Sequence, residues 1–149
     1  MNEGDAIRER RRREAGITLI EMLVVVTIIA LFAALVLPQM MNRADRAKRT
    51  AAHAQINGFM TALGTYKLDT GTYPTSEQGL KALREKPDGV SGWQGPYLQK
   101  DIPKDPWKDD YVYKYPGDHG DEPDVCSLGQ DGKPGGEGND ADICSWKNE

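Results

Sequence analysis

The sequence has few of the residues from which zinc sites and catalytic sites are built. Its 149 residues include two cysteines and two histidines. Two cysteines alone cannot form a four-ligand zinc site, and no histidine is spaced to complete one. The chain has no Ser/His/Asp or Cys/His combination and no glycine-rich phosphate-binding motif, so we predict that it is not an enzyme. Its formal net charge of −4 gives no indication of nucleic-acid binding.

The charged residues are distributed unevenly along the chain. Five arginines lie within residues 8–13, and four basic residues lie within residues 43–49. The segment from Gly117 to the end has nine acidic residues and two lysines. A basic front and an acidic back indicate two environments, a membrane surface for the first and a metal ion or solvent for the second.

A long apolar segment runs from Ile17 to Leu37. As a helix rising about 1.5 Å per residue it would be about 31 Å long, the thickness of a bilayer core. No cleavage site of small residues follows it, so we expect the segment to stay in the mature protein. Pro38 is expected to end or kink this helix. We expect a helix this long to be buried against other copies of the chain. The alternative is a simple signal-anchor helix.

Glu21 is a carboxylate within the apolar segment, and it has two possible explanations. It could lie close enough to the membrane interface to be solvated. Alternatively it has a cationic partner at the same depth, since an ionised carboxylate in hydrocarbon costs several kcal/mol. If the chain were cut after Gly16, the new amino group of Ile17 would lie four residues before Glu21 on the same helix face. That amine could pair with Glu21 of its own chain or of a neighbouring copy.

The stretch GITLIEML at residues 16–23 resembles the cleavage and methylation motif of type IV prepilins and pseudopilins. The resemblance implies that residues 1–16 are a basic leader, which a prepilin peptidase removes between Gly16 and Ile17 before methylating the Ile17 amine. It also implies that Glu21 acts in assembly. Members of this family usually have phenylalanine where this chain has Ile17. Residues 17–38 would then be the transmembrane and polymerisation helix, and residues 39–149 the globular domain.

The remaining pattern predicts an α+β domain. The helix that begins near Ile17 should continue to Leu68, broken near Pro38, because apolar residues recur at helical spacing up to Tyr66. Thr75 and Gln78 have the spacing of a capping box ahead of a short helix. A hairpin is expected from strands at residues 111–115 and 124–128, with the turn PGDHGDEP between them.

Cys126 and Cys144 flank the acidic, glycine-rich loop near the end of the chain. A disulfide between them is the simpler interpretation if the domain faces an oxidising compartment, and two free buried thiols are the alternative. A bridge closing a loop of this size would contribute roughly 3 kcal/mol in the chain-entropy model.

The loop itself carries four carboxylates at close spacing, those of Asp131, Glu137, Asp140 and Asp142. They repel one another unless a cation lies among them. Hard oxygen ligands on a flexible, glycine-rich loop suit Ca²⁺, although the spacing is not that of an EF-hand. The alternative is a solvated or disordered acidic tail, against which the apolar residues at both ends of the loop argue.

Three further blocks, at residues 66–83, 101–120 and 128–146, resemble the major pseudopilins of type II secretion systems. They read YKLDTGTYPTSEQGLKAL, DIPKDPWKDDYVYKYPGDHG and LGQDGKPGGEGNDADICSW. This resemblance implies a pilin-like fold, in which a long N-terminal helix packs on a small antiparallel β-sheet with a C-terminal calcium loop. It also implies Ca²⁺ ligands from the side chains of Asp131, Asp140 and Asp142 and from the carbonyl oxygen of Leu128.

The function implied by the resemblance is that of a filament subunit. The protein would be anchored in the bacterial inner membrane by a single span, with its C-terminal domain in the periplasm. It would polymerise with copies of itself into a pseudopilus that exports folded proteins through the outer membrane. Its implied partners are the prepilin peptidase, minor pseudopilins and the inner-membrane assembly platform.

Three other functions compete with this interpretation. A type IV pilin for adhesion or motility is favoured by the C-terminal cysteine pair. A minor pseudopilin at the filament tip is disfavoured by Glu21 and by the short chain. A membrane-anchored calcium-binding module unrelated to filaments would retain its leader.

Overall fold

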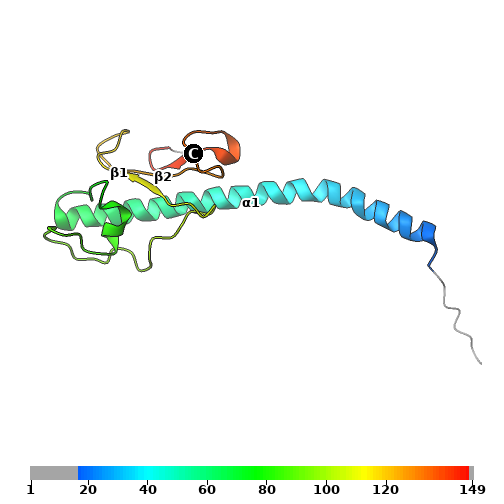
Figure 1. Cartoon of the computed structure of the whole chain (residues 1–149), viewed down its shortest axis with the longest axis horizontal. Coiled ribbons are helices and arrows are strands. Elements are labelled where there is room, and N and C mark those ends of the chain that lie inside the picture. The colour runs from blue at the N-terminus through cyan, green and yellow to red at the C-terminus, as the bar shows by residue number, and fades with distance from the viewer. Residues whose placement is uncertain (1–16, 148–149) are drawn as a thin grey trace, which may run out of the picture. The chain divides into compact units, whose positions relative to one another are not determined.

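The computed structural model describes residues 17–147, without the side chains of residues 37–42. Its elements are three helical segments and a three-stranded sheet (Figure 1). In chain order they are α1 (Leu19–Thr70), η1 (Gly79–Leu83), β1 (Val112–Lys114), β2 (Asp124–Ser127), η2 (Gly138–Asp140) and β3 (Ile143–Cys144). The predicted α+β class is confirmed. The chain forms two compact units that divide between Met40 and Met41.

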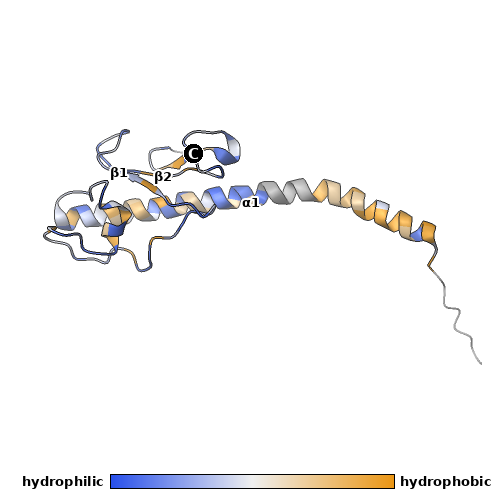
Figure 2. Ribbon diagram, in the orientation of Figure 1, coloured by the Kyte–Doolittle hydropathy of each residue, from blue (hydrophilic) through white to orange (hydrophobic). Residues whose placement is uncertain are grey.

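The N-terminal unit consists of the first part of α1. The helix begins after Thr18, whose hydroxyl oxygen accepts a hydrogen bond from the backbone N–H of Glu21 at 3.2 Å. Within it, Leu19–Val36 is long and apolar enough to cross a membrane, and none of this stretch is buried. Figure 2 shows the same stretch as an almost continuous hydrophobic ribbon. An α-helix that is apolar on all sides and uncovered needs lipid or other protein around it.

The predicted break in the helix near Pro38 is wrong, because α1 continues from Leu19 to Thr70 as one helix. Proline lacks one backbone N–H and so removes a single hydrogen bond from the ladder. A proline in a membrane-spanning helix is tolerated where neighbouring helices, side-chain hydroxyls, water or small local adjustments of the backbone satisfy the groups that it frees. The helix therefore runs into the C-terminal unit without interruption.

In the C-terminal unit, one face of α1 forms the core. The buried residues on this face recur every three or four positions, as expected for a helix with one apolar stripe: Ala52, Ile56, Phe59, Leu63 and Tyr66. They join the side chains of Leu80 and Leu83 from η1, Val125 from β2 and Ile143 from β3 in one hydrophobic cluster. Phe59 also packs edge-to-face on Tyr111, with ring centroids 5.0 Å apart.

The short helix η1 is preceded by the predicted capping box. The backbone N–H of Thr75 donates to Oε1 of Gln78 at 2.9 Å, and the backbone N–H of Gln78 donates to the Thr75 hydroxyl oxygen at 3.2 Å. These reciprocal bonds satisfy two backbone donors that would otherwise lack partners. The capping box closes the turn that leads into η1, whose Leu80 and Leu83 are buried in the core.

The sheet has the order β1-β2-β3, with both pairs antiparallel. The predicted hairpin is confirmed, since Val112 lies opposite Cys126 and Lys114 opposite Asp124. The third strand was not predicted. β3 has only two residues, too few to show the alternation by which strands are recognised in a sequence.

Candidate functional site

Glu21, the predicted assembly residue, lies in the first turn of α1 and is exposed. Within residues 17–147 its carboxylate has no ion pair with another side chain. Ile17, the predicted methylated residue, directly precedes the helix and is 67% exposed. Gly16 and the predicted leader at residues 1–16 lie outside the described residues. The carboxylate of Glu21 is therefore accessible at the start of the helix.

Thr18 gives Glu21 a second, local role that the sequence reasoning missed. Residues 18–21 have the pattern Thr-x-x-Glu, which is the spacing of a capping box. The threonine half of the box is formed, through the hydrogen bond from the Glu21 N–H. A carboxylate in the first turn also interacts favourably with the helix dipole, by about 0.3–1 kcal/mol. This local effect is small compared with the penalty for an unpaired carboxylate in hydrocarbon.

Cys126 and Cys144 form a disulfide, so the free-thiol alternative is excluded. The two residues lie directly opposite each other on β2 and β3, and both are buried. The bridge therefore fastens the short third strand to the sheet. It also closes the acidic loop at its base, as predicted.

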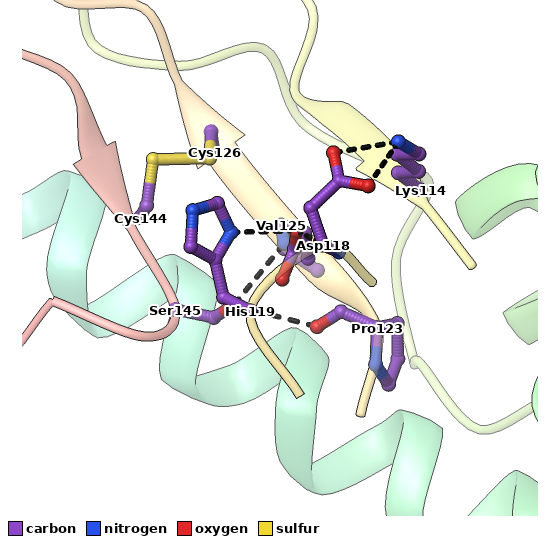
Figure 3. A network of polar contacts seen from close by, with 9 residues as sticks. Lys114, Asp118, His119, Pro123, Val125, Cys126, Cys144 and Ser145 are labelled. Carbon is purple, nitrogen blue, oxygen red and sulfur yellow. Dashed lines mark hydrogen bonds and ion pairs between the residues drawn. A yellow bond between two sulfur atoms is a disulfide. The ribbon is translucent and has the colours of Figure 1, made fainter. Parts of the chain in front are cut away.

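A network of polar contacts lies beside the disulfide (Figure 3). Oδ2 of the buried Asp124 accepts the backbone N–H of Asp118 at 2.8 Å and lies 2.9 Å from Nδ1 of His119. Lys114 forms an ion pair with Asp118, and this hydrogen bond and charge lower the pKa of the Asp118 carboxyl. The His119 ring stacks on Trp146 with centroids 3.7 Å apart. The turn between β1 and β2 is thus attached to the end of the described chain.

The acidic loop is exposed at residues 130–140. Asp142 is half-buried, and its Oδ2 accepts the backbone N–H of Gly135 at 2.8 Å. The return bond, from the Asp142 N–H to the Gly135 carbonyl oxygen, is 3.3 Å long. The other carboxylate oxygen of Asp142, Oδ1, is buried and has no hydrogen-bond partner in the described structure. A buried carboxylate oxygen without a partner is costly, and a cation would satisfy it.

The other predicted ligands lie at different points of the loop. Oδ1 of Asp131 accepts the backbone N–H of Lys133 at 3.1 Å. Asp140 is exposed at the end of η2, and Leu128 is half-buried after β2. In the part of the chain that the structure describes, no three His, Cys, Asp or Glu side chains lie close enough to hold a metal ion.

Two glycines let the loop fold tightly on itself, as its glycine content suggested. Gly136 has a φ of +85°, and a Cβ atom added there would lie 2.5 Å from the carbonyl oxygen of Asp140. Gly129 has a φ of +71°, and its Cβ would lie 2.9 Å from the same carbonyl group. Both the backbone conformation and the close approach therefore require glycine.

Asp105 is a structural residue that the sequence reasoning missed. It is only 4% exposed. Its Oδ1 accepts the backbone N–H groups of Trp107 and Asp109 at 3.0 and 2.9 Å, and its Oδ2 accepts the hydroxyl of Ser127 on β2. Asp followed by Pro is a common turn signal, but the contact with Ser127, 22 positions away, leaves no local pattern.

Comparisons with known proteins cover nearly the whole chain. Residues 39–146 match the family model of type II secretion system protein G, and residues 11–37 match the prokaryotic N-terminal methylation motif. The type II secretion system core protein G of Pseudomonas aeruginosa is 48% identical over 142 residues, which are 93% of this chain and 99% of that protein. The protein of the same name from Vibrio cholerae is 42% identical over 141 residues, 93% of this chain and 95% of that protein.

A solved structure is also similar. The crystal structure of the major pseudopilin from the type 2 secretion system of enterohaemorrhagic Escherichia coli superimposes with a TM-score of 0.62 at 35% sequence identity. The match covers 71% of this chain and 88% of that one. The expected pilin-like fold is therefore confirmed for the greater part of the molecule.

Proposed function

Because the chain belongs to the family of type II secretion system protein G, we propose that it is the major structural subunit of a type II secretion pseudopilus. The observation that carries this proposal is the uncovered apolar stretch Leu19–Val36, which is joined to a domain similar to a major pseudopilin. Copies of this helix would pack together in the filament core. Growth of the filament would drive folded proteins through the outer membrane.

The family and the apolar helix point to anchoring in the inner membrane before assembly. We place the C-terminal domain in the periplasm. The Cys126–Cys144 disulfide supports this side of the membrane, because disulfides persist in the oxidising periplasm and are rare in the cytosol. The prepilin peptidase, minor pseudopilins and the assembly platform are the partners that this function requires.

The leader would be removed between Gly16 and Ile17, and the new Ile17 amine would be methylated. The match of residues 11–37 to the N-terminal methylation motif supports this step. Measuring the intact mass of the protein purified from its native membrane tests it. A chain that begins at Ile17 with one added methyl group is expected. A mass that includes residues 1–16 would contradict both the processing and the filament function.

Glu21 would pair with the Ile17 amine of a neighbouring subunit during assembly. Its exposure and its lack of an ion pair in the described chain support a partner from another molecule. Glu21→Gln keeps the size of the side chain and removes its charge. We expect this variant to fold and insert normally but to form few filaments, as measured by shearing and by cross-linking in cells. Thr18→Ala, which removes only the helix cap, should assemble nearly as well as the wild type.

We propose Ca²⁺ as the cation of the acidic loop. Oδ1 of Asp142 is buried and has no hydrogen-bond partner among residues 17–147, and this oxygen and the oxygen-only donor set fit the ion. The side chains of Asp131, Asp140 and Asp142 and the carbonyl oxygen of Leu128 would hold it. The ion would supply the positive charge that lets these carboxylates approach one another, and so it would order the loop.

Thermal unfolding with and without a calcium chelator tests this site. At a free Ca²⁺ concentration of 100 times the Kd, binding would add about 2.7 kcal/mol to the free energy of unfolding. Asp142→Asn should abolish most of that gain, whereas Glu137→Gln, on the same loop, should retain it. Equal melting temperatures with calcium and with chelator would contradict the calcium site.

The type IV pilin alternative is not favoured. The matching family model, which covers residues 39–146, is that of type II secretion protein G. The curated relatives from Pseudomonas aeruginosa and Vibrio cholerae carry the same family name. The cysteine pair that supported a pilin is accounted for by the strand that it fastens to the sheet.

A further inference from the structure

The acidic loop is held against α1 by a side chain far away in the sequence. Nη1 of Arg49 donates to the carbonyl oxygens of Gly138 and Ala141, at 2.9 and 3.1 Å. These two carbonyl groups lie on either side of Asp140, and the second immediately precedes Asp142. One helical turn earlier, Oδ2 of Asp45 accepts a hydrogen bond from the side-chain amide of Asn139 at 2.8 Å. Asp45 and Arg49 are four residues apart and so share one face of α1.

The remaining backbone bonds of this segment connect the loop to itself. Gln130 donates its N–H to the carbonyl oxygen of Asn139, and Asp142 donates to that of Gly135. Such bonds set the shape of the loop but not its position on the domain. An exposed segment with few buried apolar contacts opens easily unless it is attached to a rigid element. The long helix α1, through Arg49 and Asp45, provides that attachment.

An arginine is well suited to this position. Its guanidinium group is planar and always charged, and it carries only donors, so it can hold two carbonyl oxygens. The resulting bonds orient the backbone on both sides of Asp140 and use neither carboxylate, so Oδ1 of Asp142 stays open to a cation among the described residues. Residues that orient metal ligands in this way typically affect metal affinity about 10- to 100-fold.

We propose that Arg49 is a positioning residue for the acidic loop, which it clamps on α1 so that Asp140 and Asp142 are set to receive a divalent cation. This inference rests on the calcium site proposed above. It implies that the loop and the α1 face at Asp45 and Arg49 are energetically coupled. A cation that orders the loop would then stabilise its contact with α1, and loss of that contact would weaken cation binding by the same factor.

The first experiment measures calcium affinity by titration calorimetry on the full chain in detergent. Arg49→Gln removes the charged donor. Arg46→Gln is the matched control, because Arg46 is an exposed arginine of the same helix and its substitution removes the same charge. We expect Arg49→Gln to bind Ca²⁺ at least about tenfold more weakly and Arg46→Gln to bind as the wild type does. Asn139→Ala, which removes the neighbouring bond to Asp45, should give a smaller loss. Equal affinity in the Arg49 and Arg46 variants would overturn the proposal, as would tighter binding by Arg49→Gln.

The second experiment separates this inference from the calcium site. Amide hydrogen exchange is followed in chelator, with no Ca²⁺ present. In Arg49→Gln, the amides of Gln130, Asp140 and Asp142 should exchange several-fold faster than in the wild type, while those of the core residues Ile56 and Leu63 should be unchanged. Unchanged loop exchange would overturn the clamp whatever the calcium affinity. Faster loop exchange in a protein that binds no calcium would support the clamp and overturn the calcium site alone.

Discussion

The two ends of α1 are both helical and rich in apolar residues, yet their surroundings differ. Between Leu19 and Val36 every large apolar side chain is exposed, with Leu31 at 64%. In the stretch from Ala52 to Tyr66 one face is buried under the sheet and η1, with Leu63 at 0%. The first stretch is apolar on all sides, and the second has an apolar stripe and a polar face. Both patterns favour a helix, but only the second is completed by its own chain.

The largest expected effect comes from a matched pair of substitutions, one in each stretch. Leu63→Ala leaves a cavity in the core and should lower the free energy of unfolding by about 2–5 kcal/mol. Leu31→Ala removes the same atoms from an uncovered surface and should change it by less than about 0.5 kcal/mol. Urea unfolding of the full chain in detergent, followed by tryptophan fluorescence, measures both. A comparable loss in Leu31→Ala would mean that the first stretch is buried within the same molecule.

The disulfide is expected to have the next largest effect. Replacing Cys126 and Cys144 with serine should lower the free energy of unfolding by about 3 kcal/mol, since the denatured chain regains the freedom of the open loop. Because the bridge and the proposed Ca²⁺ ion hold the same loop, the double variant should be more sensitive to chelator than the wild type. If the wild type and the double variant lost the same free energy of unfolding in chelator, the disulfide and the ion would not act on one loop.

Alkaline pH should destabilise the packing of the second stretch, because tyrosines cover it. Burial raises the pKa of Tyr111 well above its usual 10.0, and the nearby Asp105 raises it further. A raised pKa means that its stabilising contribution is complete below pH 10 and is lost as the pH rises toward the folded-state pKa. The free energy of unfolding should fall by about 1.4 kcal/mol per pH unit for such a group above pH 10. The pH dependence of urea unfolding should be shallower in Tyr111→Phe above pH 10 and identical between pH 7 and 9.

The smallest expected effect concerns the open face of the second stretch. A Cβ atom at Gly64 would meet nothing within 4 Å. Gly64→Ala should therefore raise the free energy of unfolding of the unassembled protein by about 1 kcal/mol, because alanine favours a helix more than glycine does. Gly129→Ala is the contrasting control and should destabilise, since its Cβ would meet the Asp140 carbonyl group. Thermal unfolding measures both. If Gly64→Ala were more stable but formed fewer filaments, Gly64 would be identified as a site of close packing between copies.

Patterns between near neighbours predicted most of the local structure. The Thr75–Gln78 capping box, the hairpin of β1 and β2 and the disulfide were each expected, because spacing or a simple count of residues specifies them. The same kind of reasoning could have found the cap at Thr18, where the Thr-x-x-Glu spacing was overlooked. It failed at Pro38, where the general rule that proline ends a helix does not hold, since α1 continues through this position.

The contacts that position the candidate site join residues far apart in the chain. Arg49 meets the carbonyl oxygens of Gly138 and Ala141 across 89 and 92 positions. The buried Asp105 meets Ser127 across 22. No periodicity links such pairs, since hydrogen bonds at these separations arise only after the core has brought α1 and the sheet together.

The sequence by itself therefore determined the apolar stretch of α1, the buried stripe of its second stretch, the capping box before η1 and the cysteine pair, because each depends on spacing along one segment. Only the tertiary structure decided that a two-residue β3 completes the sheet. It also decided that α1 clamps the acidic loop and that, among the described residues, a buried oxygen of Asp142 has no partner. These features depend on which surfaces meet once the hydrophobic core has closed, and burial then sets the energetic value of each polar group within reach.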